Sequence, residues 1–550
     1  MRIFIASILL IIAYHSFAQT GPNKYWVKLT DKDNNQYSLD SPELFLSQRA
    51  LVRRQTQGIS ITNTDLPVTQ LYIDSLKSLG LTIHNISKWF NAVTVETTDT
   101  DLLDTISNLG FVQGSEKVCT FKCRLENNFT PAIVDHSKSL SVNTYNYGVA
   151  ANQIEMFNGQ LVHNAGYTGE GVHIAVIDAG FLYSDVHPGL DSLMNSGRLL
   201  GTKDFVDGDN NVFDHHQHGH NVLSTMAALD NGGMVGTAPH ASYWLLRSED
   251  TGAEYRVEED NWISAAEFAD SAGVDIINTS LGYNTFYDAT QNYTYEDLDG
   301  NTARMSIAVD LASAKGILVT VSAGNEGSLS WHYINVPADA DSALTVGAVN
   351  EQAEYASLSS TGPTFDGRIK PNVAAQGKNT YLASGASGYV TGSGTSFSSP
   401  LVAGMAACLW QSNRGLTNMQ LLHVIEQSSS QYNAPDSLLG YGIPDFYYAL
   451  LLIEAGKDEK PLKNDLFTVY PNPFSDEMNI DLFPSDSQTV VLEVIGANGQ
   501  LLYNSEFFVM AGVRNHIVLD SRDIGDFSFY CIVRIITDKK VYKEKVIRAK

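Results

Sequence analysis

The chain has 550 residues, 43% of them hydrophobic, so it contains enough apolar material for several folded units and shows no collagen-like or disordered bias. Its 35 Lys and Arg residues against 61 Asp and Glu give a formal net charge of -26, which would repel a phosphate backbone and argues against nucleic acid as a partner. The same acidity suits a soluble protein outside the cell.

Residues 1–18 have the features of an export signal peptide. Arg2 supplies the basic end, Ile3 to Ala13 form an apolar stretch, and Ser16-Phe17-Ala18 is a small-x-small cleavage site. The stretch is too short for a membrane span, and no later uninterrupted apolar run reaches about 18 residues. We therefore predict a removable signal peptide and no transmembrane segment.

Residues 19–123 alternate between strand-like and helical patterns. The clearest runs are Tyr25 to Leu29, Leu71 to Leu79, Ala92 to Val95 and Leu102 to Leu109. They predict strand, helix, strand, helix and a closing strand, which together indicate a small α+β unit with helices on one antiparallel sheet. The segment 124–145 is polar, has no sustained periodicity and is predicted to be an exposed connector.

Residues 146–455 have a different hydrophobic pattern from the leading segment, because apolar β-branched runs alternate with helical stretches. The strand-like runs lie at 172–177, 274–277 and 316–321, and the helical stretches at 263–272 and 305–315. Nearly continuous apolar runs between helices are typical of a parallel sheet buried on both faces. This part is therefore predicted to be one doubly wound α/β domain with a mainly parallel sheet.

The end of the chain is predicted to be a separate all-β unit. A charged linker at 456–465 leads into residues 466–550, where alternating strands such as 490–494 and 527–536 recur without a helical pattern. Short alternating strands of this kind indicate a small β-sandwich.

Four cysteines are few for an exported protein of this size, so a disulfide framework is not expected to hold the fold together. Cys119 and Cys123 lie close enough in sequence to pair locally, and a metal interpretation of them lacks two further ligands. Cys408 is interpreted as a small buried hydrophobe and Cys531 as a strand residue.

Four short sequence blocks hold residues suited to catalysis. Two of them carry an acid and a base. Asp178 ends a predicted buried strand, where it would hold the tautomer of a histidine, although a turn or a strand-end cap also favours a carboxylate there. His218 begins an apolar helical run and has Gly219 beside it, which suits a general base.

Two further blocks carry an amide and a hydroxyl. Asn325 follows another buried strand and would donate an N–H to an oxyanion, or it would simply form the turn. Ser396 precedes the buried helical run 401–410. It is placed to cap that helix, and equally to act as a nucleophile beside backbone N–H groups that favour an anion.

A second interpretation of the histidine loop is a metal site. Three more histidines and several aspartates crowd the same region, namely His215, His216, His220, Asp204, Asp207, Asp209 and Asp214. Histidine with carboxylate ligands could bind a metal, whereas the aspartates alone would also suit a structural calcium loop or a solvated turn.

Taken together, the four blocks resemble the subtilisin-like serine peptidases, the subtilases. Gly394 to Pro400 matches the family's nucleophile motif Gly-Thr-Ser-x-x-x-Pro, and the Asp178 block, the His218-Gly219 pair and the block Ala323 to Gly327 stand in the family's order. One departure is the pair His220-Asn221, because subtilases commonly carry Thr-His there. An exchange of roles between His218 and His220 is therefore an alternative.

The resemblance implies a secreted serine endopeptidase with Asp178, His218 and Ser396 as its triad and Asn325 in the oxyanion hole. Peptide substrates would bind extended along the strand Ser280-Leu281-Gly282. The chemistry would need no cofactor, and a structural calcium ion would be compatible with the family. The leading unit resembles a subtilase propeptide, which would inhibit its own catalytic domain until it is cut off in the connector.

The last unit is similar to the C-terminal sorting domain of type IX secretion cargo. The matching features are Tyr470 to Phe474 and the basic stretch Lys543 to Arg548, while the terminal glycine-tyrosine pattern is blurred at Gly525-Asp526-Phe527. This similarity implies a secretion machinery as partner and a route through the periplasm to the cell surface or the medium. The rival to an enzyme is a non-catalytic adhesion protein on a subtilase scaffold.

Overall fold

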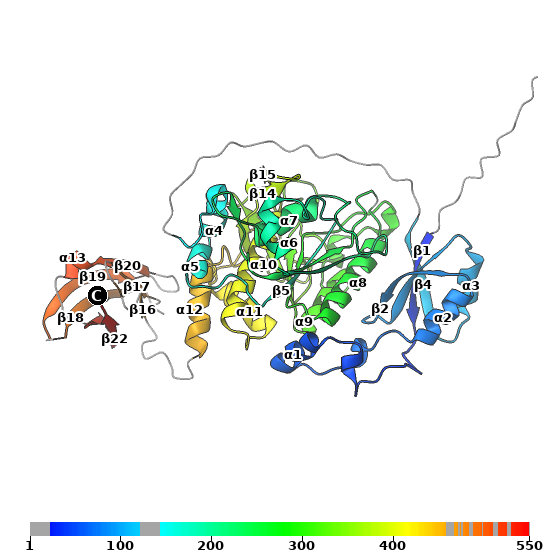
Figure 1. Ribbon diagram of the computed structural model, residues 1–550, viewed down its shortest axis with the longest axis horizontal. Helices are drawn as coiled ribbons and strands as arrows, with labels where there is room; N and C mark the ends of the chain where they lie inside the picture. The colour runs from blue at the N-terminus through cyan, green and yellow to red at the C-terminus, as the bar shows by residue number, and fades with distance from the viewer. Residues whose placement is uncertain are drawn as a thin grey trace, which may run out of the picture.

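The computed structural model describes residues 23–120, 143–252, 254–457 and most of 467–548 (Figure 1). These form a leading, a central and a last unit along the chain. The predicted signal peptide, Cys123 and nearly all of the predicted connector and linker lie outside the described residues. Among the helices that are described, none is long and apolar enough to cross a membrane.

The leading unit is a four-stranded antiparallel sheet in the order β2-β3-β1-β4. Its elements are β1 (Asn23–Leu29), α1 (Gln48–Gln57), α2 (Gln70–Ser78), β2 (Thr82–Ser87), β3 (Ala92–Thr97), α3 (Asp101–Ser107) and β4 (Val112–Cys119). Helices α2 and α3 cover one face, where Ile73, Leu76 and Ile106 pack with Val27 and Val93. The predicted α+β arrangement is therefore present in this unit.

Two elements of the leading unit were not expected from the sequence. Helix α1 has the sequence QRALVRRQTQ, which is too polar to show an apolar stripe. Strand β2 has the sequence TIHNIS, whose apolar residues stand three apart and break the alternation of a half-buried strand. Both elements also contact the central unit, through Arg54 with Asp270 and Ser87 with Glu267, and these contacts are far apart in the sequence.

The central unit is built on a seven-stranded sheet in the order β13-β12-β11-β10-β5-β9-β6, with every pair parallel. The strands are β5 (His173–Asp178), β6 (Leu199–Asp204), β9 (Ser242–Arg247), β10 (Ile276–Thr279), β11 (Leu318–Ser322), β12 (Leu344–Val349) and β13 (Val373–Gln376). The three apolar runs predicted as strands correspond to β5, β10 and β11. The carboxyl ends of all seven strands consequently lie at one edge of the sheet.

Helices cover both faces of this sheet, as the prediction of a doubly wound fold requires. They are α4 (Ala151–Glu155), α5 (Gly159–Asn164), α6 (Asp191–Asn195), α7 (His218–Ala227), α8 (Val257–Ala272), α9 (Arg304–Ala314), α10 (Thr395–Ser412), α11 (Asn418–Gln427) and α12 (Phe446–Lys457). Along β5, Ile174 and Val176 belong to the hydrophobic cluster of α7 and α10, whereas Ala175 and Ile177 belong to that of α8 and α9. Successive strand residues point to opposite faces, so one strand contributes to both cores.

Short ribbons and the last unit complete the described structure. The ribbons are β7 (Leu229–Asp230) with β8 (Met234–Val235) and β14 (Thr380–Ser384) with β15 (Gly388–Gly392). The last unit has two antiparallel sheets, β16-β17-β20 and β19-β18-β21-β22, around one hydrophobic cluster. Its elements are β16 (Phe467–Tyr470), β17 (Glu477–Leu482), β18 (Gln488–Gly496), β19 (Leu501–Val509), β20 (Asn515–Asp520), α13 (Ser521–Ile524), β21 (Tyr530–Ile536) and β22 (Val541–Ile547).

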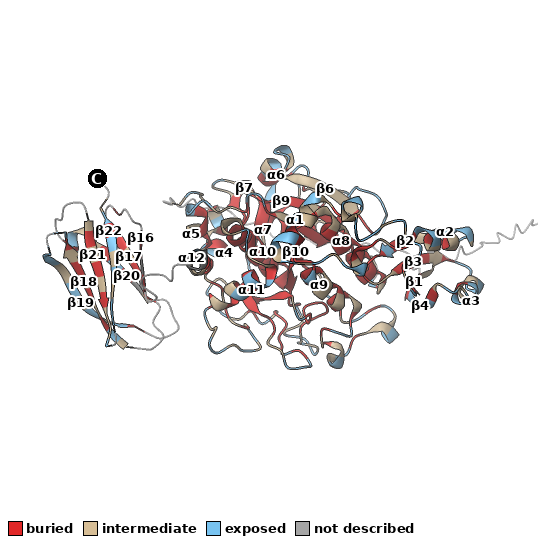
Figure 2. Cartoon of the chain, turned by 90° about the horizontal axis from the view of Figure 1, so that it is seen from below, coloured by how far each residue is buried: buried red, intermediate tan, exposed pale blue. Residues whose placement is uncertain are grey.

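The single turn of helix α13 corrects the expectation that this unit contains no helix. Cys531 is buried in β21, and Cys408 is buried in α10, as predicted for both. The blurred sorting pattern at 525–527 and most of the segment 470–474 lie outside the described residues. In the central unit the strands are largely buried, while the outer helices of the leading unit carry exposed residues (Figure 2).

Among the contacts by which the hairpin β2–β3 of the leading unit docks on α8 is the carboxylate of Glu267. Glu267 accepts hydrogen bonds from the Ser87 hydroxyl at 2.6 Å, from the Lys88 backbone N–H at 2.7 Å and from the Trp89 backbone N–H at 3.0 Å. A carboxylate with three donors is a well-satisfied buried acceptor. The Glu267 side chain of α8 therefore fixes the turn between β2 and β3.

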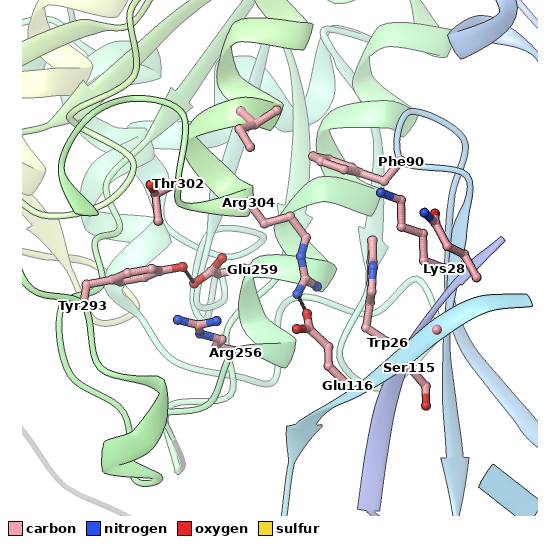
Figure 3. Close-up of a pocket in the computed structure, with 13 residues that line it drawn as sticks. Trp26, Lys28, Phe90, Ser115, Glu116, Arg256, Glu259, Tyr293, Thr302 and Arg304 are labelled. Atoms are coloured by element: carbon pink, nitrogen blue, oxygen red, sulfur yellow. Dashed lines mark hydrogen bonds and ion pairs between the residues drawn. The ribbon is translucent and has the colours of Figure 1, made fainter. Parts of the chain in front are cut away.

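Beside this contact, β1 and β4 of the leading unit face α9. Arg304 of α9 lies over the ring of Trp26, 4.2 Å from its centroid, and pairs with Glu116 of β4 (Figure 3). It also pairs with Asp260 of α8. Trp26, Glu116 and Arg304 border a cavity of about 450 Å³ between the two units, and a second cavity of about 640 Å³ borders the hairpin. The sheet of the leading unit thus rests on α8 and α9 with space left between them.

Candidate active site

The four residues singled out for chemistry lie at the carboxyl edge of the parallel sheet or at the helices that follow it. Asp178 is the last residue of β5, and Asn325 lies three residues beyond the end of β11. His218 is the first residue of α7, and Ser396 is the second residue of α10. In an α/β sheet this edge is where functional groups meet.

Asp178 and His218 are joined directly. The Nδ1 of His218 lies 2.7 Å from Oδ1 of Asp178, and Oδ1 also accepts from the backbone N–H of Ala179 at 2.7 Å. Asp178 is fully buried, whereas the side chain of His218 is 27% exposed. With Nδ1–H donating to the carboxylate, Nε2 is the ring nitrogen left to accept a proton.

The electrostatics of this pair favour the protonated ring. Burial lowers the pKa of His218, but the charge of Asp178 and its hydrogen bond outweigh burial, so the pKa is raised above 6.5. The close approach of α7 to β5 depends on Gly219, because a Cβ there would lie 2.5 Å from the carbonyl oxygen of Gly180 and 3.0 Å from Cβ of Asp178.

Ser396 lies where α10 begins, next to the end of β10. Its hydroxyl donates to the Ser280 carbonyl at 3.4 Å, and the Ser280 hydroxyl donates to the Ser396 carbonyl at 2.8 Å. The ring of His218 lies 6.0 Å from that of Phe397, the next residue along α10. The start of α10 therefore brings the Ser396 hydroxyl, the His218 ring of α7 and the end of β10 at Ser280 into one region.

Asn325 is held at the same helix start. Its Oδ1 accepts from the backbone N–H of Thr395 at 2.8 Å and from the Thr395 hydroxyl at 3.1 Å. Because the carbonyl oxygen of the amide is occupied in this way, Nδ2 is the atom left to donate to a ligand. Gly394 leaves room beside the amide, since a Cβ there would lie 3.6 Å from Nδ2.

The loop that carries Asn325 is fixed by a residue to which sequence reasoning gave no role. The Oε2 of Glu326 accepts from the backbone N–H of Asn325 at 2.7 Å, from Asn335 Nδ2 at 2.9 Å and from the Ser360 hydroxyl at 2.9 Å. Glu326 stands in the block Ala323 to Gly327 that carries the subtilase resemblance, but only the fold brings it together with Asn335 and Ser360. They are positioning residues for the amide.

The predicted substrate strand follows β10 directly. Ser280 is buried, Leu281 is partly exposed and Gly282 is exposed. Among the described residues, no hydrogen bond joins the backbone of Leu281 or Gly282 to another part of the chain. Their N–H and C=O groups are therefore available to an extended peptide that adds as a further strand.

The histidine cluster does not converge on one point. His220 is fully buried, with Nδ1 3.1 Å from the Ser184 hydroxyl, and burial lowers its pKa to about 3. His216 Nδ1 accepts from the backbone N–H of His218 at 3.2 Å. Of the two histidines at 218 and 220, only His218 contacts Asp178, so the geometry favours His218 as the base.

Asp204, Asp207 and His215 are the three histidine-loop residues whose ligand atoms lie close enough together to share a metal ion. The Nε2 of His215 lies 3.6 Å from Asp204 and 3.3 Å from Asp207, close enough for a shared metal. However, Nη1 of Arg247 donates to the same oxygens at 2.6 and 2.8 Å. The guanidinium of Arg247 pairs with both carboxylates, so these residues form an ion-pair network in this structure.

Comparison with known proteins adds two family matches. Residues 169–442 match the subtilase family, and residues 24–131 match the peptidase S8 propeptide domain of Bacteroidota. Subtilisin E of Bacillus subtilis (strain 168) is 34% identical over 281 residues, which are 50% of this chain and 65% of that protein, slightly less than two thirds of its length.

Two further proteins extend the comparison. Subtilisin DY of Bacillus licheniformis is 33% identical over 305 residues, 54% of this chain and 95% of that protein. The crystal structure of MycP1 with the N-terminal propeptide removed has a TM-score of 0.43 and 23% identity, covering 54% of this chain and 96% of that one. Because a relative more than 30% identical is matched over almost its whole length, the chain belongs to the subtilase family of serine-type endopeptidases and carries a propeptide domain of the Bacteroidota kind.

Proposed function

We propose that this chain is a secreted serine endopeptidase made as a zymogen, with Asp178, His218 and Ser396 as its catalytic triad and Asn325 in its oxyanion hole. The observation that carries the proposal is the 2.7 Å hydrogen bond between Asp178 and His218, next to the start of the helix that bears Ser396. A buried carboxylate that orients an imidazole beside a serine is the arrangement of nucleophilic serine catalysis.

The proposed reaction begins when Nε2 of His218 takes the proton of the Ser396 hydroxyl as its oxygen attacks a peptide carbonyl carbon. Asp178 stabilises the imidazolium, and Asn325 Nδ2 with the Ser396 backbone N–H stabilises the oxyanion. His218 then gives the proton to the leaving amine. Water, deprotonated by the same ring, attacks the acyl group and releases Ser396. No cofactor takes part in these steps.

Protein and peptide substrates would bind extended along Ser280-Leu281-Gly282, where the backbone groups of Leu281 and Gly282 are available. The leading unit would act as the enzyme's own inhibitor, released by a cut in the connector between Cys123 and Tyr147. The signal peptide and the last unit would bring the protein through the periplasm to the cell surface or medium by the type IX secretion machinery.

The decisive test is Ser396→Ala in the full-length chain. Wild type is expected to mature to a shorter form, to cleave casein and to be silenced by a serine-directed covalent inhibitor, whereas Ser396→Ala stays full-length and inactive. Ser393→Ala is the matched control, because the Ser393 hydroxyl accepts from the Asn379 backbone N–H at 3.1 Å in place of facing Ser280. It should mature normally.

Two other outcomes would support the rival functions. If a chelator abolished cleavage and the serine-directed inhibitor did not, the protein would be a metal-dependent enzyme. If the protein cleaved nothing even after removal of the leading unit, it would be a binding protein on a subtilase scaffold. Either result would contradict the proposed triad.

A further inference from the structure

Helix α1 lies far from the sheet of the leading unit to which it belongs, beneath the central unit and beside α9 (Figure 1). It docks where strands of the parallel sheet begin. The residues it contacts stand shortly before β5, β10 and β11, at Gly171, Gly273 to Asp275, and Lys315 to Gly316. The candidate active site lies at the opposite, carboxyl edge, about 20 Å away along a six-residue strand.

Side chains of α1 donate hydrogen bonds to backbone carbonyls that lie just before the strands. Arg49 donates to the carbonyl of Gly273 at 3.0 Å and to that of Gly171 at 2.8 Å. Gln57 Nε2 donates to the carbonyl of Gly316 at 2.8 Å, and its Oε1 accepts from the backbone N–H of Asn418 at 3.0 Å. Such contacts fix both the position and the register of the helix.

A buried charge network completes the contact. Asp270, at the end of α8, accepts from Arg53 at 2.5 Å, from Arg54 at 2.9 Å and from Lys88 at 3.0 Å, and the carboxylate is fully buried. Burial would raise the pKa of Asp270, but these three cations outweigh it and lower the pKa below 3.8. All three cations belong to the leading unit, while Asp270 belongs to the central unit.

A second carboxylate of the central unit is paired in a similar way. Asp275, also buried, accepts from Arg49 of α1 and, at 2.6 Å, from Arg414 of the central unit. Arg54 in turn pairs with Asp65, which accepts from Lys315 at 3.1 Å. The ion pairs therefore cross between the two units in both directions, and separating the units would leave several buried charges without partners.

The charged side chains at this docking site are buried. Arg53 and Arg54 are 5% and 1% exposed, although cavities of about 640 and 120 Å³ border the contact at Lys88 and at Arg49. The charge network lies at the amino edge of the sheet, so it does not depend on any chain segment in the substrate cleft.

We propose that α1 is a second anchor of the leading unit, which keeps that unit bound to the central unit after the connector between them has been cut. The proposal rests on the proposed function only in taking the connector as the place of the cut. The contacts of α1 are remote from the cleft, so they add to the affinity between the two units independently of any segment that occupies the cleft. Release requires loss of the α1 contacts, by dissociation or by further cleavage.

The test uses the Ser396→Ala chain with the recognition sequence of a specific external protease inserted within residues 124–142. After that protease has cut the connector, the two parts are expected to co-elute in gel filtration. With Arg53→Ala and Arg54→Ala combined, the dissociation constant between the parts should rise at least about 30-fold, the effect of removing one side of a buried charge pair. Gln55→Ala, on the exposed side of the same helix, should leave it unchanged.

Binding in this design needs no catalysis, so its failure is distinct from failure of the peptidase. The proposal would be overturned if wild type and the double variant had equal dissociation constants. It would equally be overturned if the double variant differed from wild type only in refolding more slowly. Arg53→Lys with Arg54→Lys keeps the charges and should restore part of the affinity. If the alanine variant does not fold, Arg49→Ala takes its place, and an unchanged dissociation constant there would equally overturn the proposal.

Discussion

Two hydrogen bonds determine which atoms at the carboxyl edge are left for substrate. The bond from His218 Nδ1 to Asp178 leaves Nε2 as the basic atom of the ring. The bond from the Thr395 backbone N–H to Asn325 Oδ1 leaves Nδ2 as the donor of the amide. In both cases a neighbour removes an ambiguity that the side chain has by itself, which is the orientation of an amide or the tautomer of an imidazole.

At Asn325 we predict that replacement by alanine lowers turnover by about 10²–10³, the effect known for a subtilisin that loses such a donor. The Michaelis constant should change little, because the donor acts on charge that develops only in the transition state. Steady-state kinetics with a soluble peptide substrate measures both constants. A rise in the Michaelis constant at unchanged turnover would show that Asn325 binds the ground state instead.

For His218 we predict an acid limb of kcat/KM with its midpoint above pH 6.5. The base works as the neutral imidazole, so activity grows as pH rises through the raised pKa and is lost as pH falls below it. Asp178→Asn removes the charge that raises this pKa and leaves burial, which lowers it, so the limb should move to lower pH. NMR titration of the His218 ring tests the same shift independently, and a titration midpoint unmoved by Asp178→Asn would contradict the pairing.

At the scale of elements, the docking of α7 on β5 sets the distance between base and acid. Gly219 makes this docking close, since any side chain there would meet the carbonyl of Gly180 at 2.5 Å and the ring of Phe181 at 2.8 Å. We predict that Gly219→Ala shifts α7 and lowers kcat/KM by at least tenfold. Gly415→Ala is the control, because its Cβ would meet only the Asn413 side chain at 3.2 Å.

Both glycine variants are measured for casein cleavage and for thermal stability. Gly219→Ala should lose activity out of proportion to any loss of stability, because the methyl group acts on the geometry of His218 and Asp178. Equal activity in Gly219→Ala and wild type would mean that α7 can retreat without separating this pair.

Sequence periodicity predicted the elements unevenly. The runs at 172–177 and 316–321 were expected as strands and correspond closely to β5 and β11, because buried parallel strands are apolar throughout. Helix α8 begins at Val257, six residues before the predicted start at Ile263. Its first turn holds Glu258, Glu259 and Asp260, whose burial no pattern of apolar residues indicates.

At the scale of the whole molecule, the last unit has a hydrophobic core of its own. Among the described residues, every member of its cluster lies between Phe467 and Val546. The two hydrophobic clusters of the central unit contain no described residue beyond Ile453, so none of their residues comes from the last unit. The last unit therefore adds nothing to the packing around the candidate active site.

A chain that ends at Lys457 is accordingly predicted to keep its casein-cleaving activity and its melting temperature. The comparison is made with the full-length protein after maturation, by differential scanning calorimetry and by the casein assay. A large fall in either quantity would show that the last unit supports the central one.

The sequence by itself predicted the parallel sheet, the order of the four chemical blocks and the candidate residues Asp178, Asn325 and Ser396, because these signals are local runs and short motifs. It left His218 and His220 as alternatives. Only the tertiary structure separates them, since one ring meets a carboxylate 40 residues away while the other is buried against Ser184. The docking of helix α1 was likewise decided by the fold, because Arg54 pairs with Asp270 at a separation of 216 residues, and such distant charge pairs leave no apolar periodicity in the sequence of the helix.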